Sequence, residues 1–175
     1  MRTSDVVDIG SDSLTQVAAR VWRERPREYR VWEGSAEVGS GDEFWRWASA
    51  EVLRWGVKTR SGFTVDPDHR VSPGDRPIIT ARALGLSVRE PVEVVEVIDT
   101  DNRVGFAYRT LPRHPVSGEE AFIVERVGAS VTLSIRSLTR ASETWQWRPA
   151  YPLLLLAQVI ARRRYLLALR GNAAP

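Results

Sequence analysis

The stretch Gly105-Phe-Ala-Tyr-Arg-Thr-Leu-Pro-Arg-His-Pro-Val-Ser-Gly-Glu-Glu120 decides how we interpret the fold of this chain. Phe106, Tyr108 and Thr110 alternate with smaller or charged residues, a period that is typical of a half-buried strand. Two prolines and a glycine interrupt the alternation, which then restarts at Phe122. The pattern therefore predicts a β-hairpin with a polar connection between two apolar strands.

The hairpin loop holds the candidate catalytic residues. His114 is one of only two histidines in the chain, and the adjacent carboxylates Glu119 and Glu120 follow it closely. Histidine exchanges a proton near neutral pH, and a carboxylate beside it can orient it or act with it. The alternative interpretation is structural, since a His-Pro pair often forms a turn and Gly-Glu-Glu often begins a solvated strand. This structural interpretation is the commoner one for surface loops.

Strand parity extends the candidate site. If Phe106 faces a covering helix, Tyr108 does so too, and Glu120 and Phe122 share a side on the returning strand. A bulge at either strand would turn one of these sets outward. The candidate ligand-binding residues are Phe106, Tyr108, Arg109, Thr110, Arg113, His114, Glu120, Phe122 and Trp55. Among them, Arg109 or Arg113 would lie at the rim and meet an anionic group.

The motif elements Gly-Phe-Ala-Tyr, Thr-Leu-Pro, His-Pro and Ser-Gly-Glu-Glu of this stretch resemble the signature of a known family. That family is catalogued as the domain of unknown function numbered nineteen-ninety, and the resemblance extends over about residues 30–164. The chain departs from the pattern at Arg109 and Arg113, where glycine is expected. The resemblance implies a small soluble domain similar to the START-like helix-grip proteins, which bind lipids and other apolar ligands.

A helix is expected after a first strand at residues 30–38. Ser40-Gly-Asp-Glu43 matches a capping box, and Gly56 suits the end of the helix. Apolar residues recur between them at helical spacing: Phe44, Trp45, Ala48, Val52 and Trp55. Tryptophans at this spacing more often face a core than form a stacking platform for bases, so we expect no nucleic-acid surface here.

Further strands are predicted at residues 78–86, 91–98 and 131–136, with a loop at 59–77. A long helix is expected from Tyr151 to Leu169. Its first half, Leu153–Ile160, is apolar all round, which indicates burial on more than one side. The sheet and a loop with Trp145 and Trp147 would supply that burial, and a dimer or membrane-surface contact is the alternative.

These elements predict an α+β fold of the helix-grip, START-like type, with an antiparallel sheet of about six strands wrapped around the long C-terminal helix. Residues 1–28 are interpreted as an N-terminal extension with a short helix at 13–23 that stops before Pro26. Residues 29–170 form a single helix-grip-like domain, and residues 171–175 form a disordered tail.

The composition of 175 residues, with 43% hydrophobic residues and no cysteine, fits one core without disulfides or thiolate chemistry. The N-terminus shows no signal-peptide pattern and the apolar runs are too short to span a bilayer, so a cytoplasmic protein is expected. Residues 136–170 are rich in arginine, which can favour phosphate or anionic lipid and would allow a weak membrane-surface contact, although genome composition is the commoner reason for such a preference. Lys58 is the only lysine in the chain.

Cofactor and metal chemistry find no support in the sequence. We found no phosphate-binding loop and no dinucleotide fingerprint, so no cofactor is expected. Two distant histidines without cysteine make a metal site improbable.

Three functions stay open: a module that binds an apolar or aromatic molecule or lipid between sheet and helix, a cofactor-independent enzyme that uses His114 with Glu119 or Glu120, and an interaction protein with a filled core. The expected partner is an apolar or amphipathic small molecule, and a homodimer is an option.

Overall fold

The structure, a computed structural model, describes residues 13–23, 25–83, 86–142 and 149–171. Seven antiparallel strands form a sheet in the order β1-β7-β6-β5-β4-β3-β2. The strands are β1 (Arg30–Ser40), β2 (Phe63–Asp66), β3 (Ile78–Ala83), β4 (Leu86–Asp99), β5 (Arg103–Thr110), β6 (Val116–Val127) and β7 (Ser130–Ala141). The helices are α1 (Asp42–Val52), α2 (Gly56–Thr59) and α3 (Tyr151–Leu167).

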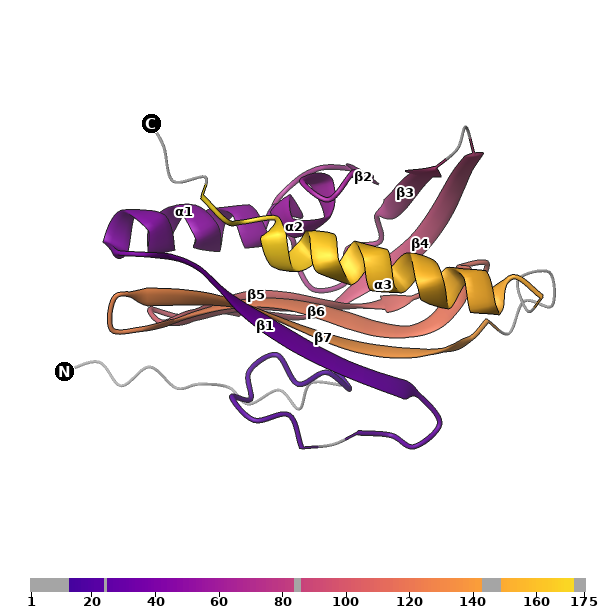
Figure 1. Ribbon diagram of the computed structural model, residues 1–175, viewed down its shortest axis with the longest axis horizontal. Coiled ribbons are helices and arrows are strands. Elements are labelled where there is room, and N and C mark those ends of the chain that lie inside the picture. The colour runs from indigo at the N-terminus through magenta and orange to yellow at the C-terminus, as the bar shows by residue number, and fades with distance from the viewer. Residues whose placement is uncertain (1–12, 24, 84–85, 143–148, 172–175) are drawn as a thin grey trace.

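All three helices lie on one face of the sheet, and residues 13–22 cross the opposite face (Figure 1). The predicted α+β class, with an antiparallel sheet and a covering C-terminal helix, is confirmed. The sheet has seven strands because the short strand β2 forms within residues 59–77, which we expected to be loop.

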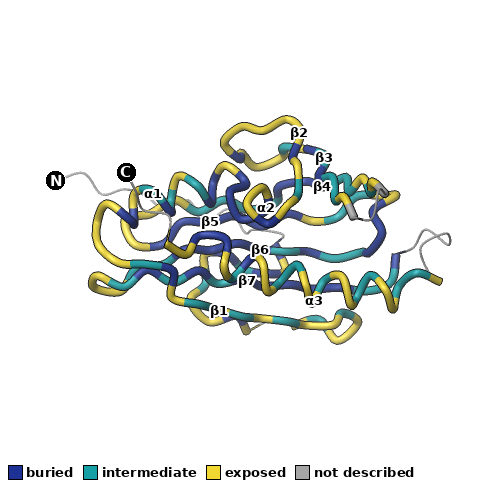
Figure 2. The backbone as a smooth tube through the Cα atoms, turned by 45° about the horizontal axis from the view of Figure 1, so that its top comes forward, coloured by how far each residue is buried: buried dark blue, intermediate teal, exposed yellow. Residues whose placement is uncertain are grey.

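The main core fills the space between the sheet and helices α1 and α2. Strands β5 to β7 are largely buried, whereas α3 alternates between half-buried and exposed residues (Figure 2). Phe44, Trp45 and Trp55 are 5%, 7% and 2% exposed, which confirms that they are core residues. Trp55 packs edge-on against Phe106 of β5 with ring centroids 4.7 Å apart. This aromatic layer anchors α1 and α2 to the centre of the sheet.

Helix α1 begins and ends differently from the prediction. Its N-cap is Gly41 without a side-chain cap bond, because Ser40 still belongs to β1 and pairs with Ser130. The helix ends at Val52, and Trp55 then adopts a left-handed backbone with φ 61°. Gly56 therefore opens the next helix instead of closing the first one.

Residues 13–22, here called the N-terminal strap, lie on the outer face of the sheet as a series of turns and form no helix. Val17 packs there against Ala107, Ala121 and Ile123. The predicted helix at 13–23 is thus wrong for this segment. Its backbone groups bond to charged side chains of the sheet, so they are not available for helical bonds.

Charged side chains of both signs hold the strap. Glu119 accepts hydrogen bonds from the backbone N–H groups of Leu14 and Thr15 at 3.1 and 2.8 Å. Arg136, which is 2% exposed, donates to the carbonyl oxygens of four strap residues: Thr15, Gln16, Ala19 and Arg20. These bonds satisfy a guanidinium that would otherwise be buried without compensation.

Helix α3 lies over β7 and β1 and ends at Leu167, two residues before the predicted end. Its outer face exposes large apolar side chains, with Leu156 at 59% and Ile160 at 50% exposure. The predicted second buried side is therefore absent among the described residues, and Trp145 and Trp147 lie outside them. A dimer or membrane-surface contact of this face stays a prediction. None of the described helices is long and apolar enough to cross a membrane.

We expect Arg136→Gln to release the strap from the sheet, because four backbone carbonyls lose a donor and only those of Gln16 and Ala19 keep another one, from the N–H of Ala19 and from Arg103 respectively. Hydrogen–deuterium exchange of residues 13–22 should then accelerate at least tenfold. The control is Arg126→Gln, which removes an exposed ion pair to Asp42. Unchanged protection of the strap in Arg136→Gln would contradict this assignment.

Candidate functional site

A pocket of about 420 Å³ lies between the sheet and α3. Its walls are mostly apolar, and the apolar residues among its lining include Phe63, Val88, Val116, Leu138, Leu153, Leu154, Ala157 and Ala161. The face of α3 that carries Leu154, Ala157, Ala161 and Tyr165 looks into this space, as its helical spacing indicates. Side chains of the described residues therefore leave room between the sheet and the helix.

The inner end of the pocket holds a buried lysine. Lys58, on the short helix α2, is 3% exposed. Its Nζ lies 3.0 Å from Oε2 of Glu120 and donates a hydrogen bond of 2.7 Å to the hydroxyl of Tyr165. The hydroxyl of Tyr108 donates to the same carboxylate oxygen of Glu120. The cluster joins α2, β5, β6 and α3 at one point.

Four aromatic rings surround the ammonium group of Lys58. Its Nζ lies 4.7 Å from the ring centroid of Phe63, 4.8 Å from Tyr165, 5.3 Å from Tyr108 and 5.8 Å from Phe122. Ring faces attract a cation at these distances, and the attraction is stronger where water is excluded. The rings and Glu120 together replace the water that Lys58 loses on burial.

The electrostatics of the cluster keep its protons in place. Burial, the largest single effect, would lower the pKa of Lys58, but the charge of Glu120 together with Tyr108, Tyr165 and Glu90 outweighs it and holds that pKa well above the ordinary value. Burial, then the charge of Glu120, raises the pKa of Tyr108 well above its usual range. Lys58 is thus an ammonium ion and Tyr108 a neutral phenol at physiological pH. This state suits binding and orientation, and it does not suit a lysine nucleophile.

His114 lies at the side of the same pocket and is 8% exposed. The backbone N–H of Val116 donates to its Nδ1 at 3.1 Å, so the neutral ring carries its proton on Nε2. Nε2 lies 3.9 Å from Oε2 of Glu90, which is too long for a hydrogen bond. Burial, with help from the charge of Lys58, lowers the pKa of His114 to about 3. Burial also raises the pKa of Glu90.

The structure brings five of the sequence-predicted residues to the lining of this pocket: Tyr108, Thr110, His114, Glu119 and Glu120. Tyr108 and Glu120 are direct partners across β5 and β6, which confirms that they share a face. The register shift of the sheet falls in β4 between Val94 and Glu96, so it leaves this parity intact. Trp55, Phe106 and Phe122 belong to the adjacent core and are not lining residues.

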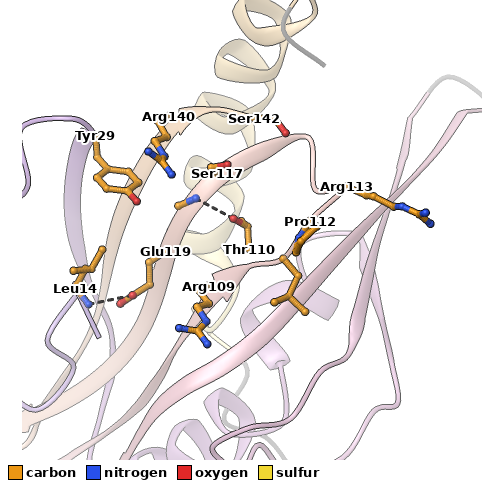
Figure 3. A pocket seen from close by; sticks show the side chains of 12 residues that line it. Leu14, Tyr29, Arg109, Thr110, Pro112, Arg113, Ser117, Glu119, Arg140 and Ser142 are labelled. Atoms are coloured by element: carbon orange, nitrogen blue, oxygen red, sulfur yellow. Dashed lines mark hydrogen bonds between the residues drawn. The ribbon is translucent and has the colours of Figure 1, made fainter. Parts of the chain in front are cut away.

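Arg109 and Arg113 lie elsewhere, and the carboxylate of Glu119 is bonded to the strap although this residue also borders the pocket beside α3. All three residues line a second pocket of about 530 Å³ on the side of the strap (Figure 3). Arg109 donates to Glu93 at 2.7 Å, and Glu119 is occupied by the strap. Arg113 has φ 77°, a left-handed conformation that favours glycine, and its side chain points away from the other labelled residues (Figure 3). The two arginines and the carboxylate of Glu119 are therefore not placed to meet a ligand beside α3.

Gly118 explains part of the hairpin motif. A Cβ atom at this position would lie 1.8 Å from the carbonyl oxygen of Leu138, so only glycine allows β6 to approach β7 so closely. Its N–H also donates to Oγ1 of Thr110 at 3.0 Å across the hairpin. The glycine therefore has a structural role that fixes the position of the following carboxylates.

Sequence reasoning missed Lys58, Glu90 and Tyr165. The signal for Lys58 was present, because it is the only lysine among 25 basic residues. Where arginine serves at every other basic position, a retained lysine indicates a site that a guanidinium does not fit. No comparable signal marks Glu90 or Tyr165. No group of three or more metal-ligating side chains gathers within the part of the chain that the structure describes.

Known proteins resemble this chain in sequence and in fold. The model of a family described as "Domain of unknown function (DUF1990)" matches residues 13–168. A UPF0548 protein of Deinococcus radiodurans is 40% identical over 85 residues, which cover 48% of this chain and 42% of that protein. The match thus spans less than half the length of this curated relative.

Three solved structures are similar at a TM-score of 0.54. A hypothetical protein from Helicobacter pylori is 13% identical, with 83% of this chain and 88% of that chain covered. A protein from Arthrobacter aurescens is 16% identical, with coverage of 82% and 89%. The ZhuI aromatase/cyclase from Streptomyces sp. R1128 is 16% identical, with coverage of 83% and 93%. At these identities the likeness shows the helix-grip fold alone.

The ion pair inside the aromatic rings should be strongly coupled. We expect Lys58→Met to cost about 3–5 kcal/mol in the free energy of unfolding, because it leaves the Glu120 carboxylate buried without its cation. The double variant Lys58→Met/Glu120→Gln should lose less than the sum of the two single losses. Urea unfolding measures all three. Arg60→Met breaks a partly exposed pair with Glu51 and should cost at most about 1 kcal/mol.

The depressed pKa of His114 predicts a pH dependence of stability. Between about pH 6.5 and pH 3 the unfolded chain binds a proton at this histidine and the folded chain does not. The free energy of unfolding therefore falls as the pH falls through this window, by up to about 1.4 kcal/mol per pH unit.

His114→Asn should reduce the slope of unfolding free energy against pH in that window, and the exposed His69→Asn should leave it unchanged. Comparing each variant with the wild type separates this slope from that of the carboxylates, which titrate in the same range. Equal slopes in wild type and His114→Asn would contradict the assignment.

Proposed function

We propose that this chain, which belongs to the DUF1990 family, binds a small and mostly apolar molecule in the pocket between its sheet and α3. The observation that carries the proposal is the pocket itself. Its volume of about 420 Å³ falls in the range of small-molecule sites, and apolar walls surround a few convergent polar groups. An interaction protein with a filled core would not need such a space.

The polar groups of the pocket are suited to orienting a ligand. The hydroxyl of Tyr165 accepts from Lys58, so its own proton is free to point to a bound oxygen atom. Nε2 of His114 offers a second N–H donor farther along the pocket. An apolar molecule with one or two acceptor oxygens would satisfy both donors.

From the described residues we place the opening of the pocket beside the first turns of α3. Leu153 and Ala157 line the pocket and are also exposed to solvent. A ligand could pass between these side chains and the β5–β6 connection without unfolding the core. The exposed apolar surface of α3 lies next to this opening and would ease the transfer of an apolar molecule from another apolar phase.

A second candidate function is cofactor-independent acid–base catalysis. It is favoured by His114 and Glu90, a neutral imidazole and a carboxylate of raised pKa that face each other at 3.9 Å in the pocket. A small shift or a bound oxygen atom between them would connect the two groups for proton transfer. Glu90 thus takes the place in this hypothesis that the sequence suggested for Glu119 or Glu120.

Filling the pocket should abolish binding. We expect Ala157→Trp to weaken the binding of the uncharged fluorescent probe N-phenyl-1-naphthylamine at least tenfold, because the indole occupies the space of the ligand. Leu156→Trp places the same side chain on the outer face of α3 and should bind the probe as the wild type does. Probe fluorescence and the unfolding midpoint of each variant are measured together. Equal probe affinities in both variants would count against the pocket as the binding site.

Native mass spectrometry of the purified protein separates the two candidate functions. A molecule retained in the pocket can be identified and added back to the ligand-free protein. A binding protein returns this molecule unchanged, whereas an acid–base enzyme converts it at a rate that His114→Asn abolishes.

A further inference from the structure

Two buried polar atoms on α3 lack a hydrogen-bond partner among the described residues: Nε of Arg162 and Oε1 of Gln158. Both residues line the pocket between the sheet and α3, and they lie one helical turn apart. Other atoms of the same side chains are bonded, since Arg162 donates to Oγ of Ser137 at 3.1 Å and Gln158 donates to Oγ1 of Thr139 at 3.2 Å. Buried polar atoms without a partner are rare in folded proteins, so these two indicate a group that binds there.

Arg162 also carries a charge that no carboxylate neutralises by direct contact within the described chain. Glu120 contributes to its electrostatic environment, but the oxygen of Glu120 that lies in the cluster contacts Lys58 and Tyr108. The guanidinium of Arg162 lies 4.7 Å from the ring centroid of Trp32. The stacked ring and the bond to Ser137 hold the guanidinium in position, so a ligand need not order it on binding.

The position of Arg162 suits the charged end of an amphipathic molecule. A guanidinium matches a carboxylate geometrically, because two parallel N–H groups meet two oxygens. Ala157 and Ala161 lie next to Arg162 on α3, and Leu154 extends the apolar wall toward the opening. A chain or ring attached to the carboxylate would lie against this wall. The amide of Gln158 would accept a hydrogen bond from a hydroxyl or water next to the head group.

We propose that the pocket takes an amphipathic carboxylate, that Arg162 binds its carboxylate group, and that Gln158 stands beside it as a further polar contact. This inference rests on the proposed function, because it names the class of ligand for the same pocket. It also assigns the anion contact to α3, whereas the sequence suggested Arg109 or Arg113 for that role.

The experiment compares dodecanoate with methyl dodecanoate, which has the same chain without the charge. Each compound displaces N-phenyl-1-naphthylamine from the protein, and the displacement gives its affinity. We expect the wild type to bind dodecanoate about tenfold more tightly than the ester. Arg162→Gln should reduce this preference to about one while the affinity for the ester stays the same. Arg163→Gln, an exposed neighbour on the same helix, should keep the tenfold preference.

Arg162→Lys gives a second measurement in case the glutamine variant folds poorly. It retains the charge without the two parallel N–H groups, so we expect an intermediate preference for the carboxylate. Ester binding in each variant reports whether the pocket is intact. A wild type that binds acid and ester equally, or an Arg162→Gln protein that keeps the preference, overturns the inference and leaves the proposed function standing. Failure of both compounds and the uncharged probe to bind overturns the proposed function as well.

Discussion

The buried ion pair between Lys58 and Glu120 is the constraint on which the pocket depends. An ammonium group this deep in a protein must find an opposite charge and donors or acceptors for its protons. Glu120 supplies the charge, Tyr165 supplies an oxygen, and four rings take the place of water. Because these groups come from α2, the sheet and α3, the pair ties the covering helix to the strands beneath it. The same requirement keeps this end of the pocket polar while its walls are apolar.

The two faces of the sheet contact different parts of the chain, and two adjacent residues of β6 make one contact on each face. Glu119 and Glu120 follow each other in β6, so their side chains point to opposite faces. Glu119 binds the N-terminal strap on the outer face, whereas Glu120 binds Lys58 on the inner face. Arg136 of β7 likewise serves the strap. The strap lies on the outer face, and the pocket on the inner face beneath α3 is the one that we propose to hold a ligand.

The proposed ligand site combines these features with the properties of α3. The inward face of the helix carries small residues that leave space, and Arg162 and Gln158 place polar atoms in that space. The inner cluster and Arg162 then offer two separate polar points to one molecule. Glu120 neutralises Lys58 by direct contact, whereas Arg162 contacts no carboxylate among the described residues, and this difference favours a single negative charge on the proposed ligand.

The sequence by itself determined the class of the fold, because alternation in the hairpin and in Val131, Leu133 and Ile135 reports strands that bury one side. It also predicted that Tyr108 shares a side with Phe106 and Glu120 with Phe122, since parity within a strand is a local property, but the pairing of β5 with β6 decided that both sets face the same side. Tertiary structure decided the rest. The strap is not a helix because Glu119 and Arg136 compete for its backbone groups, and those partners lie more than a hundred residues away. Lys58, Glu90 and Tyr165 meet at the pocket only after three elements pack together. Burial and pairing, which set their charges, are properties of that packing and leave no pattern in the sequence beyond the solitary lysine.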